Sequence, residues 1–268
     1  PTGARSRTDK RMELFWGVAA FVLGAVVGSF LNVCIWRIPE GKSIVTPASH
    51  CPRCGSPVRA YDNIPIVSWL VLRGRCRDCG GAISPRYPLV ELLTALLSLA
   101  LLWLYGPGLP YLAAFLFAAA LVVITFIDLD HQIIPDVISL PGIPVFFLLA
   151  VFVMGVPFWE SLFGILIGGG FLYLIAVGYE LLAKREGMGG GDIKLLAMIG
   201  AFLGWKSLFF VVFMSSILGA LVGVVLIALK GKDMKYAVPF GPFLSIAAVL
   251  YLFVGPALTH LVLFRTLP

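Results

Sequence analysis

Length, composition and charge together exclude a water-soluble globular protein. The chain has 268 residues, of which 60% are hydrophobic and 13% are charged, and its mean hydropathy is +0.99. A soluble core of this size cannot bury so many apolar side chains. The formal net charge of +6 does not require nucleic acid as a partner, because basic loops that meet anionic lipid headgroups are sufficient explanation. We therefore expect an integral membrane protein in contact with the lipid bilayer, with no nucleic acid partner.

The apolar segments predict an all-α polytopic membrane protein with about eight transmembrane helices. A helix needs roughly 20 apolar residues to cross a hydrocarbon core of about 30 Å. The first apolar segment is preceded by Arg11 but lacks the small-residue cleavage pattern of a secretory signal, so we expect it to be retained. Eight segments with almost no charge are expected to be helices: residues 14–36, 88–105, 110–127, 137–155, 161–182, 193–204, 207–229 and 238–257.

These segments suggest a division of the chain. We expect an N-terminal tail or cloning remnant, a first transmembrane helix, a small polar insertion and a larger membrane domain, over residues 1–11, 12–37, 38–87 and 88–268 respectively.

The distribution of Lys and Arg predicts which side faces the cytoplasm, where basic loops remain. Eight of the 20 basic residues lie between Arg37 and Arg86, so we expect the insertion at the cytoplasmic face. The loops after the fifth and seventh predicted helices are also basic and belong to the same side. Lys206, Arg265 and four basic residues of the N-terminal segment fall on the opposite side, and the N-terminal four argue against this topology unless they are a cloning remnant.

The polar insertion contains two CxxC pairs, which are typical of a metal site. Cys51 and Cys54 are separated by 21 residues from Cys76 and Cys79, and a glycine follows each pair. Four thiolates at this spacing can converge on a tetrahedral zinc ion, and a glycine favours the tight turn that each pair needs. Two disulfides are the alternative, which a reducing cytoplasm disfavours. A closed set of four thiolates leaves no position for water, so we expect structural zinc that holds a small domain together.

Two acidic clusters stand at the ends of apolar segments. Asp128, Asp130 and Asp136 follow the third predicted helix, and Asp128 alone directly ends its apolar run. Asp192 begins the sixth helix, and Glu91 lies near the start of the second. Ionisable groups at membrane depth are candidates for function. For Glu91 two roles remain open, namely favouring the N-terminus of its helix and supporting a cofactor site.

Three consecutive glycines, Gly189, Gly190 and Gly191, precede Asp192. Asp192 could cap the helix that follows, but capping does not explain the glycines. Glycines permit close approach of a backbone or a ligand, and they leave a loop able to admit a large substrate. We therefore expect an active-site loop at this position.

Asp128 and Asp192 form a plausible pair for peptide hydrolysis. Two carboxylates close together in a partly dry site favour one protonated acid and one base that activates water. The sequence contains no Ser/His/Asp arrangement with a recognisable elbow, no HExxH motif and no phosphate-binding GxxxxGK[ST] motif. An aspartic endopeptidase is the chemistry that the acidic clusters favour.

The same residues resemble a known family. The run Gly189-Gly190-Gly191-Asp192 resembles the GxGD motif of intramembrane aspartyl proteases, and its surroundings are similar to those of bacterial type IV prepilin peptidases. Further motifs of that family are matched in order along the chain by Gly28-Ser29-Phe30-Leu31-Asn32-Val33, Asp62-Asn63-Ile64-Pro65, Arg86-Tyr87-Pro88-Leu89-Val90-Glu91 and Pro239-Phe240-Gly241-Pro242. Each motif is weak alone, but their joint order is specific.

The resemblance implies a bifunctional enzyme of the bacterial inner membrane, with active sites facing the cytoplasm. Such an enzyme cleaves the basic leader of type IV prepilins or pseudopilin precursors, and it N-methylates the new terminal residue with S-adenosylmethionine. By motif position, the catalytic aspartates correspond to Asp128 and Asp192. The four cysteines favour the bifunctional type, and Glu91 is a candidate contributor to the methyltransferase site. The methyltransferase activity follows from the resemblance alone.

Two other functions are compatible with the residues by themselves. In a proton-coupled transporter, Asp128, Asp192 and Glu91 would relay protons, although the sequence has no convincing internal repeat of the kind that many transporters contain. In a noncatalytic assembly scaffold, the zinc domain would serve as a docking module.

Overall fold

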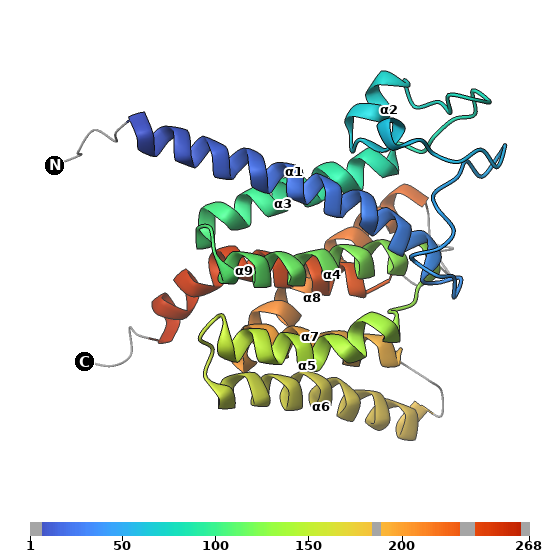
Figure 1. Ribbon diagram of the computed structural model, residues 1–268. Coiled ribbons are helices and arrows are strands. Elements are labelled where there is room, and N and C mark those ends of the chain that lie inside the picture. The colour runs from blue at the N-terminus through green and yellow to red at the C-terminus, as the bar shows by residue number, and fades with distance from the viewer. Residues whose placement is uncertain (1–6, 184–188, 231–238, 264–268) are drawn as a thin grey trace. The chain divides into compact units, whose positions relative to one another are not determined.

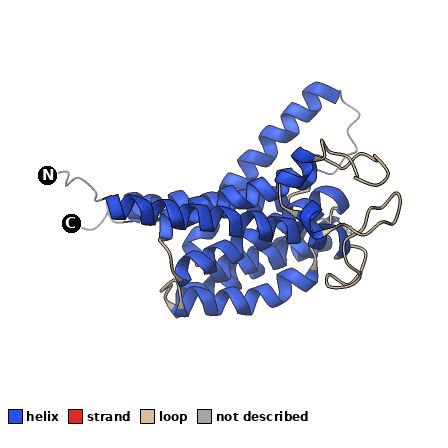
Figure 2. Cartoon of the chain, turned by 45° about the horizontal axis from the view of Figure 1, so that its top comes forward, coloured by secondary structure: helices blue, strands red, loops and turns tan. Residues whose placement is uncertain are grey.

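The computed structural model describes residues 7–183, 189–230 and 239–263, and within these ranges it is helical, with two isolated bridge pairs and no strand (Figure 2). The predicted all-α class is therefore confirmed. The elements in chain order are α1 (Arg7–Arg37), the short 3-10 helix η1 (Ala60–Asn63), α2 (Val67–Val71), α3 (Arg86–Tyr105), α4 (Leu109–His131), α5 (Asp136–Phe152), α6 (Phe158–Ala183), α7 (Gly190–Leu203), α8 (Trp205–Lys230) and α9 (Gly241–Leu263).

Each of the eight predicted membrane segments corresponds to one helix of the structure. In the described part of the chain, α1, α3, α4 and α8 are long and apolar enough to cross a membrane, while α5 and the described parts of α6 and α9 are shorter apolar helices. These helices make the chain a multi-pass membrane protein. Helix α7 has 14 residues and rises about 21 Å, which is less than the roughly 30 Å of a hydrocarbon core.

The chain divides into two compact units, residues 1–123 and residues 124–268, with the boundary inside α4. In the first unit, α1 and α3 lie side by side (Figure 1). A Cβ atom added to Gly24 would lie 2.6 Å from the Cα of Ala95, and one added to Gly28 would lie 2.7 Å from the Cα of Glu91. The two glycines, one helical turn apart, therefore allow the backbones of α1 and α3 to approach closely.

In the second unit, α7 is the central helix. Its residues Leu195–Phe202 are all buried, and it packs against α5, α6, α8 and α9. The backbones of α6 and α7 meet where Gly164 faces Gly200, since a Cβ at either position would overlap the other backbone. The short α7 is thus enclosed by longer helices, which explains why its apolar face extends all around it.

Candidate active site and metal centre

Asp128 lies in the last turn of α4 and is buried, with 5% of its surface exposed. Its Oδ2 atom accepts a hydrogen bond of 3.0 Å from the backbone N–H of Gly241. Asp130 and Asp136, in contrast, are exposed. Of the three acids that follow the third predicted helix, Asp128 is the one buried inside the protein.

Gly241 is the first residue of α9, and this explains the bond. The first backbone N–H groups of a helix have no partner inside the helix, and the Asp128 carboxylate satisfies one of them. A Cβ atom on residue 241 would lie 2.6 Å from Oδ2 of Asp128, so any other residue would displace the carboxylate. Gly241 belongs to the motif Pro239-Phe240-Gly241-Pro242, but the sequence alone predicted no role for it. Its position just before Pro242, at the start of a predicted helix, is the feature that could have indicated this role.

Asp192 lies in the first turn of α7 and is partly buried. Gly189 occupies the N-cap position and α7 has no side-chain cap, so the alternative in which Asp192 caps the helix is wrong. Instead, the carboxylates of Asp192 and Asp128 are close enough to interact electrostatically. The structure thus brings together the two acids that the sequence paired.

The glycines before Asp192 differ from one another. A Cβ atom on Gly191 would lie 2.8 Å from the Cβ of Ile134, whereas one on Gly189 or Gly190 would meet no atom of the described residues within 4 Å. Ile134 also packs close to Gly241, where an added Cβ would lie 3.2 Å from its Cδ1 atom. Gly191 therefore allows α7 to pack closely against Ile134. Gly189 and Gly190 have no such neighbour among the described residues. The preceding residues of the motif, 186–188, lie outside the described residues.

An ion pair that the sequence did not suggest fixes the first turn of α7. Lys194 Nζ lies 2.7 Å and 2.8 Å from the two carboxylate oxygens of Asp136, at the start of α5. Because Lys194 is two residues after Asp192, the pair connects the acid of α7 to the segment that follows Asp128.

Glu91 is buried, with 7% exposed, and it belongs to the first unit. It is the sixth residue of α3 and lies beyond the first turn, so a role in favouring the helix N-terminus is wrong. Its Oε2 atom accepts a 2.6 Å hydrogen bond from the backbone N–H of Ile66, and the Ser29 hydroxyl also bonds to it. Ile66 has a φ of +64°, which is strained for a β-branched residue. Glu91 therefore anchors the start of α2 to the helices α1 and α3.

The four cysteines of the insertion form a cluster suited to a metal. Their Sγ atoms all lie within 4.8 Å of one another, and those of Cys51 and Cys79 are 3.9 Å apart. Tetrahedral zinc with Zn–S bonds of about 2.3 Å separates its sulfurs by about 3.8 Å, so the donor set fits. All four are free thiols.

The two CxxC pairs adopt the same turn. In each, the N–H of the glycine after the second cysteine donates to the carbonyl of the first, over 2.9 Å. Gly55 and Gly80, which make these bonds, have φ values of +71° and +68°. Only glycine adopts this conformation without strain. The role predicted for the two glycines is therefore confirmed.

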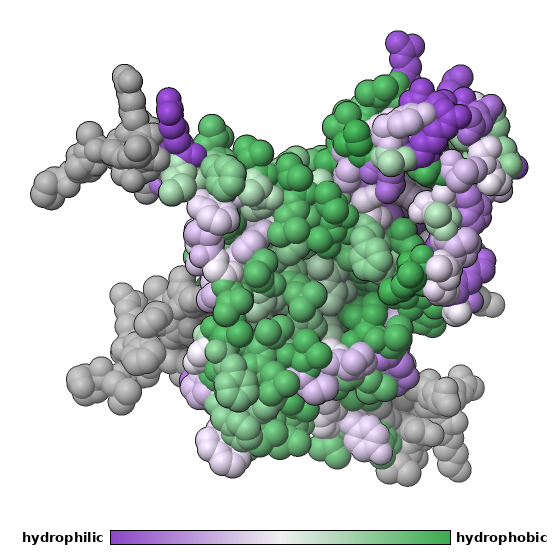
Figure 3. All heavy atoms as spheres, in the orientation of Figure 1, coloured by the Kyte–Doolittle hydropathy of each residue, from purple (hydrophilic) through white to green (hydrophobic). Residues whose placement is uncertain are grey.

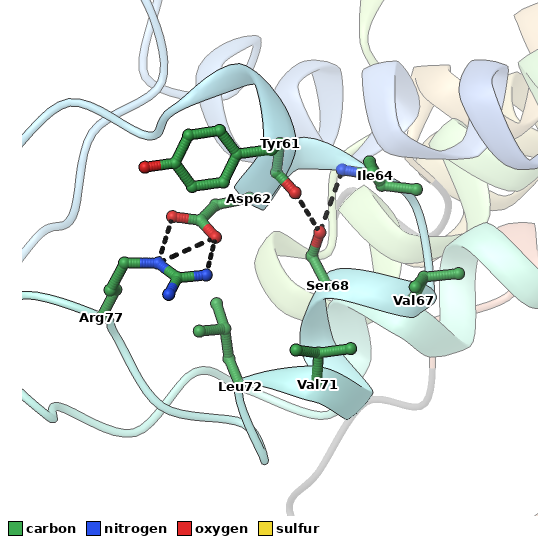
Figure 4. Close-up of a pocket in the computed structure, with 8 residues that line it drawn as sticks. All are labelled: Tyr61, Asp62, Ile64, Val67, Ser68, Val71, Leu72 and Arg77. Atoms are coloured by element: carbon green, nitrogen blue, oxygen red, sulfur yellow. Dashed lines mark hydrogen bonds and ion pairs between the residues drawn. The ribbon is translucent and has the colours of Figure 1, made fainter.

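A small pocket of about 130 Å³ lies in the insertion, lined by residues of η1 and α2 and by Arg77 (Figure 4). On one side the guanidinium of Arg77 forms a two-pronged ion pair with Asp62, with a closest contact of 2.6 Å, and this pair lowers the pKa of Asp62. Ser68 closes the turn by donating to the Tyr61 carbonyl, over 3.0 Å. The lining residues are Tyr61, Asp62, Ile64, Val67, Ser68, Val71, Leu72 and Arg77.

Comparison with known proteins identifies the family to which this multi-pass membrane protein belongs. Residues 22–105 match the family described as "Bacterial Peptidase A24 N-terminal domain", and residues 115–224 match the "Type IV leader peptidase family". No solved structure matches the chain significantly.

Curated relatives cover nearly the whole chain. The "Prepilin leader peptidase/N-methyltransferase" of Aeromonas salmonicida is 41% identical over 268 residues, which is 90% of this chain and 91% of that protein. The proteins of the same name from Pseudomonas aeruginosa and Neisseria gonorrhoeae are each 38% identical, and cover 91% and 85% of this chain and 92% and 87% of their own lengths. The chain belongs to the type IV leader peptidase family, and the predicted resemblance is confirmed.

Proposed function

We propose that this chain is a prepilin leader peptidase and N-methyltransferase that cleaves with Asp128 and Asp192 at the cytoplasmic edge of the inner membrane. Family membership supports the two activities and does not support the transporter alternative. The observation that carries the site assignment is the arrangement around Asp128. A buried carboxylate oriented by the Gly241 amide, with a second carboxylate in electrostatic range, supports peptide hydrolysis by two acids.

In the proposed cleavage, water attacks the peptide bond between leader and pilin. One aspartate removes a proton from the water, while the other donates a hydrogen bond to the scissile carbonyl and later protonates the leaving amine. Since Oδ2 of Asp128 accepts the Gly241 N–H, its Oδ1 remains for the water or the substrate. The Lys194–Asp136 pair and the contact between Gly191 and Ile134 hold the first turn of α7, and thereby Asp192, in place.

The substrate side of the proposal rests on charge and hydropathy. An apolar pilin helix would lie among the membrane helices while its basic leader stays on the cytoplasmic side, at the end of α4 that carries Asp128. The positions of Gly189 and Gly190, where an added Cβ would meet no atom of the described residues within 4 Å, support entry of the chain to be cleaved beside Asp192. Pseudopilin precursors with the same layout are included in the substrate class.

The metal part of the proposal is structural zinc held by Cys51, Cys54, Cys76 and Cys79. The mutual spacing of the sulfurs supports it. Bound zinc would hold together a domain that has few buried apolar residues and would take no part in hydrolysis, because four thiolates leave no coordination position for water.

The methyl donor proposed from the relatives' name is S-adenosylmethionine. The pocket lined by η1, α2 and Arg77 does not fit the whole molecule, because its volume of about 130 Å³ is well below the roughly 300 Å³ of small-molecule sites. In addition, Asp62 and Arg77, its charged residues, are already paired with each other. We therefore do not assign this pocket as the binding site of the methyl donor.

The deciding experiment incubates the purified protein, in detergent or liposomes, with a prepilin and S-adenosylmethionine, and measures the product masses. We expect loss of the leader and gain of one methyl group on the shortened chain. An intact prepilin after incubation with the folded, metal-loaded protein would contradict the proposed peptidase, and would favour the scaffold alternative. A cleaved but unmethylated product would contradict only the methyltransferase half.

A further inference from the structure

Helix α2 exposes apolar side chains although it belongs to the polar insertion. Val67, Leu70 and Val71 are 51%, 61% and 70% exposed, and Ile64, just before the helix, is 49% exposed. Only Ser68 of the helix is fully buried. Exposing so many apolar side chains of a five-residue helix to water costs free energy. A membrane beside this helix would remove that cost.

Two helices place the start of α2 at membrane depth. Glu91, which binds the N–H of Ile66, lies five residues inside α3, or about 7.5 Å from its first residue. On α1, the residue that faces Glu91 is Gly28, nine residues and about 13 Å before the final Arg37. Both helices are long and apolar enough to span a bilayer. Measured along α3 or α1, the start of α2 lies about one and a half or two and a half helical turns, respectively, inside the end of a span.

The charges beside α2 match the surface of a membrane. Arg73 and Arg75, which follow the helix directly, are both exposed. In Figure 3 the hydrophilic atoms of the insertion lie next to hydrophobic atoms, and in Figure 1 α2 lies beside the first turns of α3. A short apolar helix followed by arginines is the arrangement of segments that lie in the membrane interface, where the arginines reach the anionic headgroups.

We propose that α2 is an interfacial anchor that inserts Val67, Leu70 and Val71 into the boundary between headgroups and acyl chains, and so holds the zinc-binding insertion against the membrane. The Ile66–Glu91 bond sets the depth of this anchor. The partner is the lipid bilayer itself, because the exposed apolar residues lie at the depth of the membrane. This surface is independent of the catalytic assignment of Asp128 and Asp192.

The test replaces Val71 by the photoreactive residue p-benzoylphenylalanine in the full-length protein, reconstituted in vesicles of phosphatidylethanolamine and phosphatidylglycerol. After irradiation, mass spectrometry identifies lipid adducts. Val58, in the same insertion, apolar and 40% exposed, is the matched control position. We expect about tenfold more lipid adduct from position 71 than from position 58, since an aliphatic side chain prefers hydrocarbon to water by about that factor or more.

The same photoreactive residue is placed at Leu70 in a second variant, so that the result does not depend on one substitution. We expect the same excess of lipid adduct at position 70 over position 58. Equal lipid yields at positions 71, 70 and 58 would overturn the proposal. It would also be overturned if, in the presence of a prepilin, the adducts at position 71 were formed with the prepilin in place of lipid, because the surface would then belong to the substrate.

Discussion

The tetracysteine cluster and the acid pair hold their side chains together in different ways. Each CxxC pair is shaped by a turn of a few residues, closed by a backbone hydrogen bond and a glycine with positive φ. Asp128 and Asp192 are 64 residues apart in the sequence, and Asp128 is oriented by Gly241, which is 113 residues away from it. The cysteine cluster is therefore a local structure joined by metal, whereas the acid pair depends on the packing of whole helices.

This difference predicts how each region responds to substitutions. A cluster joined by metal should lose its ion when one ligand is removed, while the membrane helices stay folded. The acid pair should lose activity when a carboxylate is neutralised, and it should also be sensitive to small changes at glycines far away in the sequence. The predictions below test this contrast, beginning with the largest expected effect.

Neutralising either acid should abolish cleavage. We expect Asp128→Asn and Asp192→Asn each to reduce the rate of prepilin cleavage by about 10³-fold or more, as removal of a catalytic group does. Asp130→Asn, which changes an exposed acid two residues away, is the control and should cleave at nearly the normal rate. Methylation of a precleaved pilin should persist in both Asn variants. Wild-type cleavage by Asp128→Asn would refute the acid pair.

Removing a cysteine of the cluster should release the metal. In Cys51→Ser or Cys76→Ser, metal analysis of the purified protein should show a large loss from a starting content of about one zinc ion per chain. The matched control is Cys34→Ala, because Cys34 is buried within α1 and lies outside the cluster. Full metal retention in either serine variant would rule out zinc ligation by these residues.

Adding one methyl group at Gly241 should disturb Asp128. We expect Gly241→Ala to cleave prepilin roughly 10- to 100-fold more slowly, because the new Cβ would displace the carboxylate by a substantial part of an ångström. Gly223→Ala is the control, since a Cβ there meets nothing within 4 Å. Normal cleavage by Gly241→Ala would show that the absence of a side chain at position 241 is not needed to place the Asp128 carboxylate.

Shortening Glu91 should loosen the insertion without loss of metal. Glu91→Ala leaves the N–H of Ile66 without its partner, which costs about 1–3 kcal/mol. Hydrogen exchange at the start of α2 should therefore become about tenfold faster. Glu91→Gln keeps an acceptor oxygen and should change exchange much less. Equal exchange in the wild type and the Ala variant would show that the bond does not anchor α2.

The smallest effect is expected at the Asp62–Arg77 ion pair, which is partly exposed to solvent. Asp62→Asn should slightly accelerate loss of zinc to a chelator at neutral pH. Because Arg77 lowers the pKa of Asp62 in the folded protein, the pair stabilises the insertion above the usual carboxyl pKa of about 3.9, and this stabilisation is lost as the pH falls through the lowered value. A difference between wild type and variant that grew on acidification would contradict this.

Much of the fold could be predicted because its signals are local. Apolar runs of the length of a membrane located every long helix, and the spacing of Cys51, Cys54, Cys76 and Cys79 indicated the cluster. The burial of Asp128 was also predictable, because it directly ends an apolar run.

Other features could not be predicted, because they depend on contacts between distant segments. The partner of Glu91 is a backbone N–H in the insertion, and nothing in the residues around Glu91 points to Ile66. The glycines before Asp192 look alike in the sequence, yet only Gly191 faces a neighbouring side chain, that of Ile134. The catalytic roles of the acids and the domain boundaries stay predictions.

The sequence by itself determined that this is a multi-pass helical membrane protein of the type IV leader peptidase family, with four cysteines spaced for a metal and acids at the ends of apolar segments. Composition and spacing suffice for these conclusions, because membrane helices and CxxC turns are specified by neighbouring residues. The tertiary structure decided which amide orients Asp128, which of the three glycines packs against Ile134 and which backbone group Glu91 binds. These depend on the packing of helices that are remote in the sequence, as in the contact of Asp128 with Gly241.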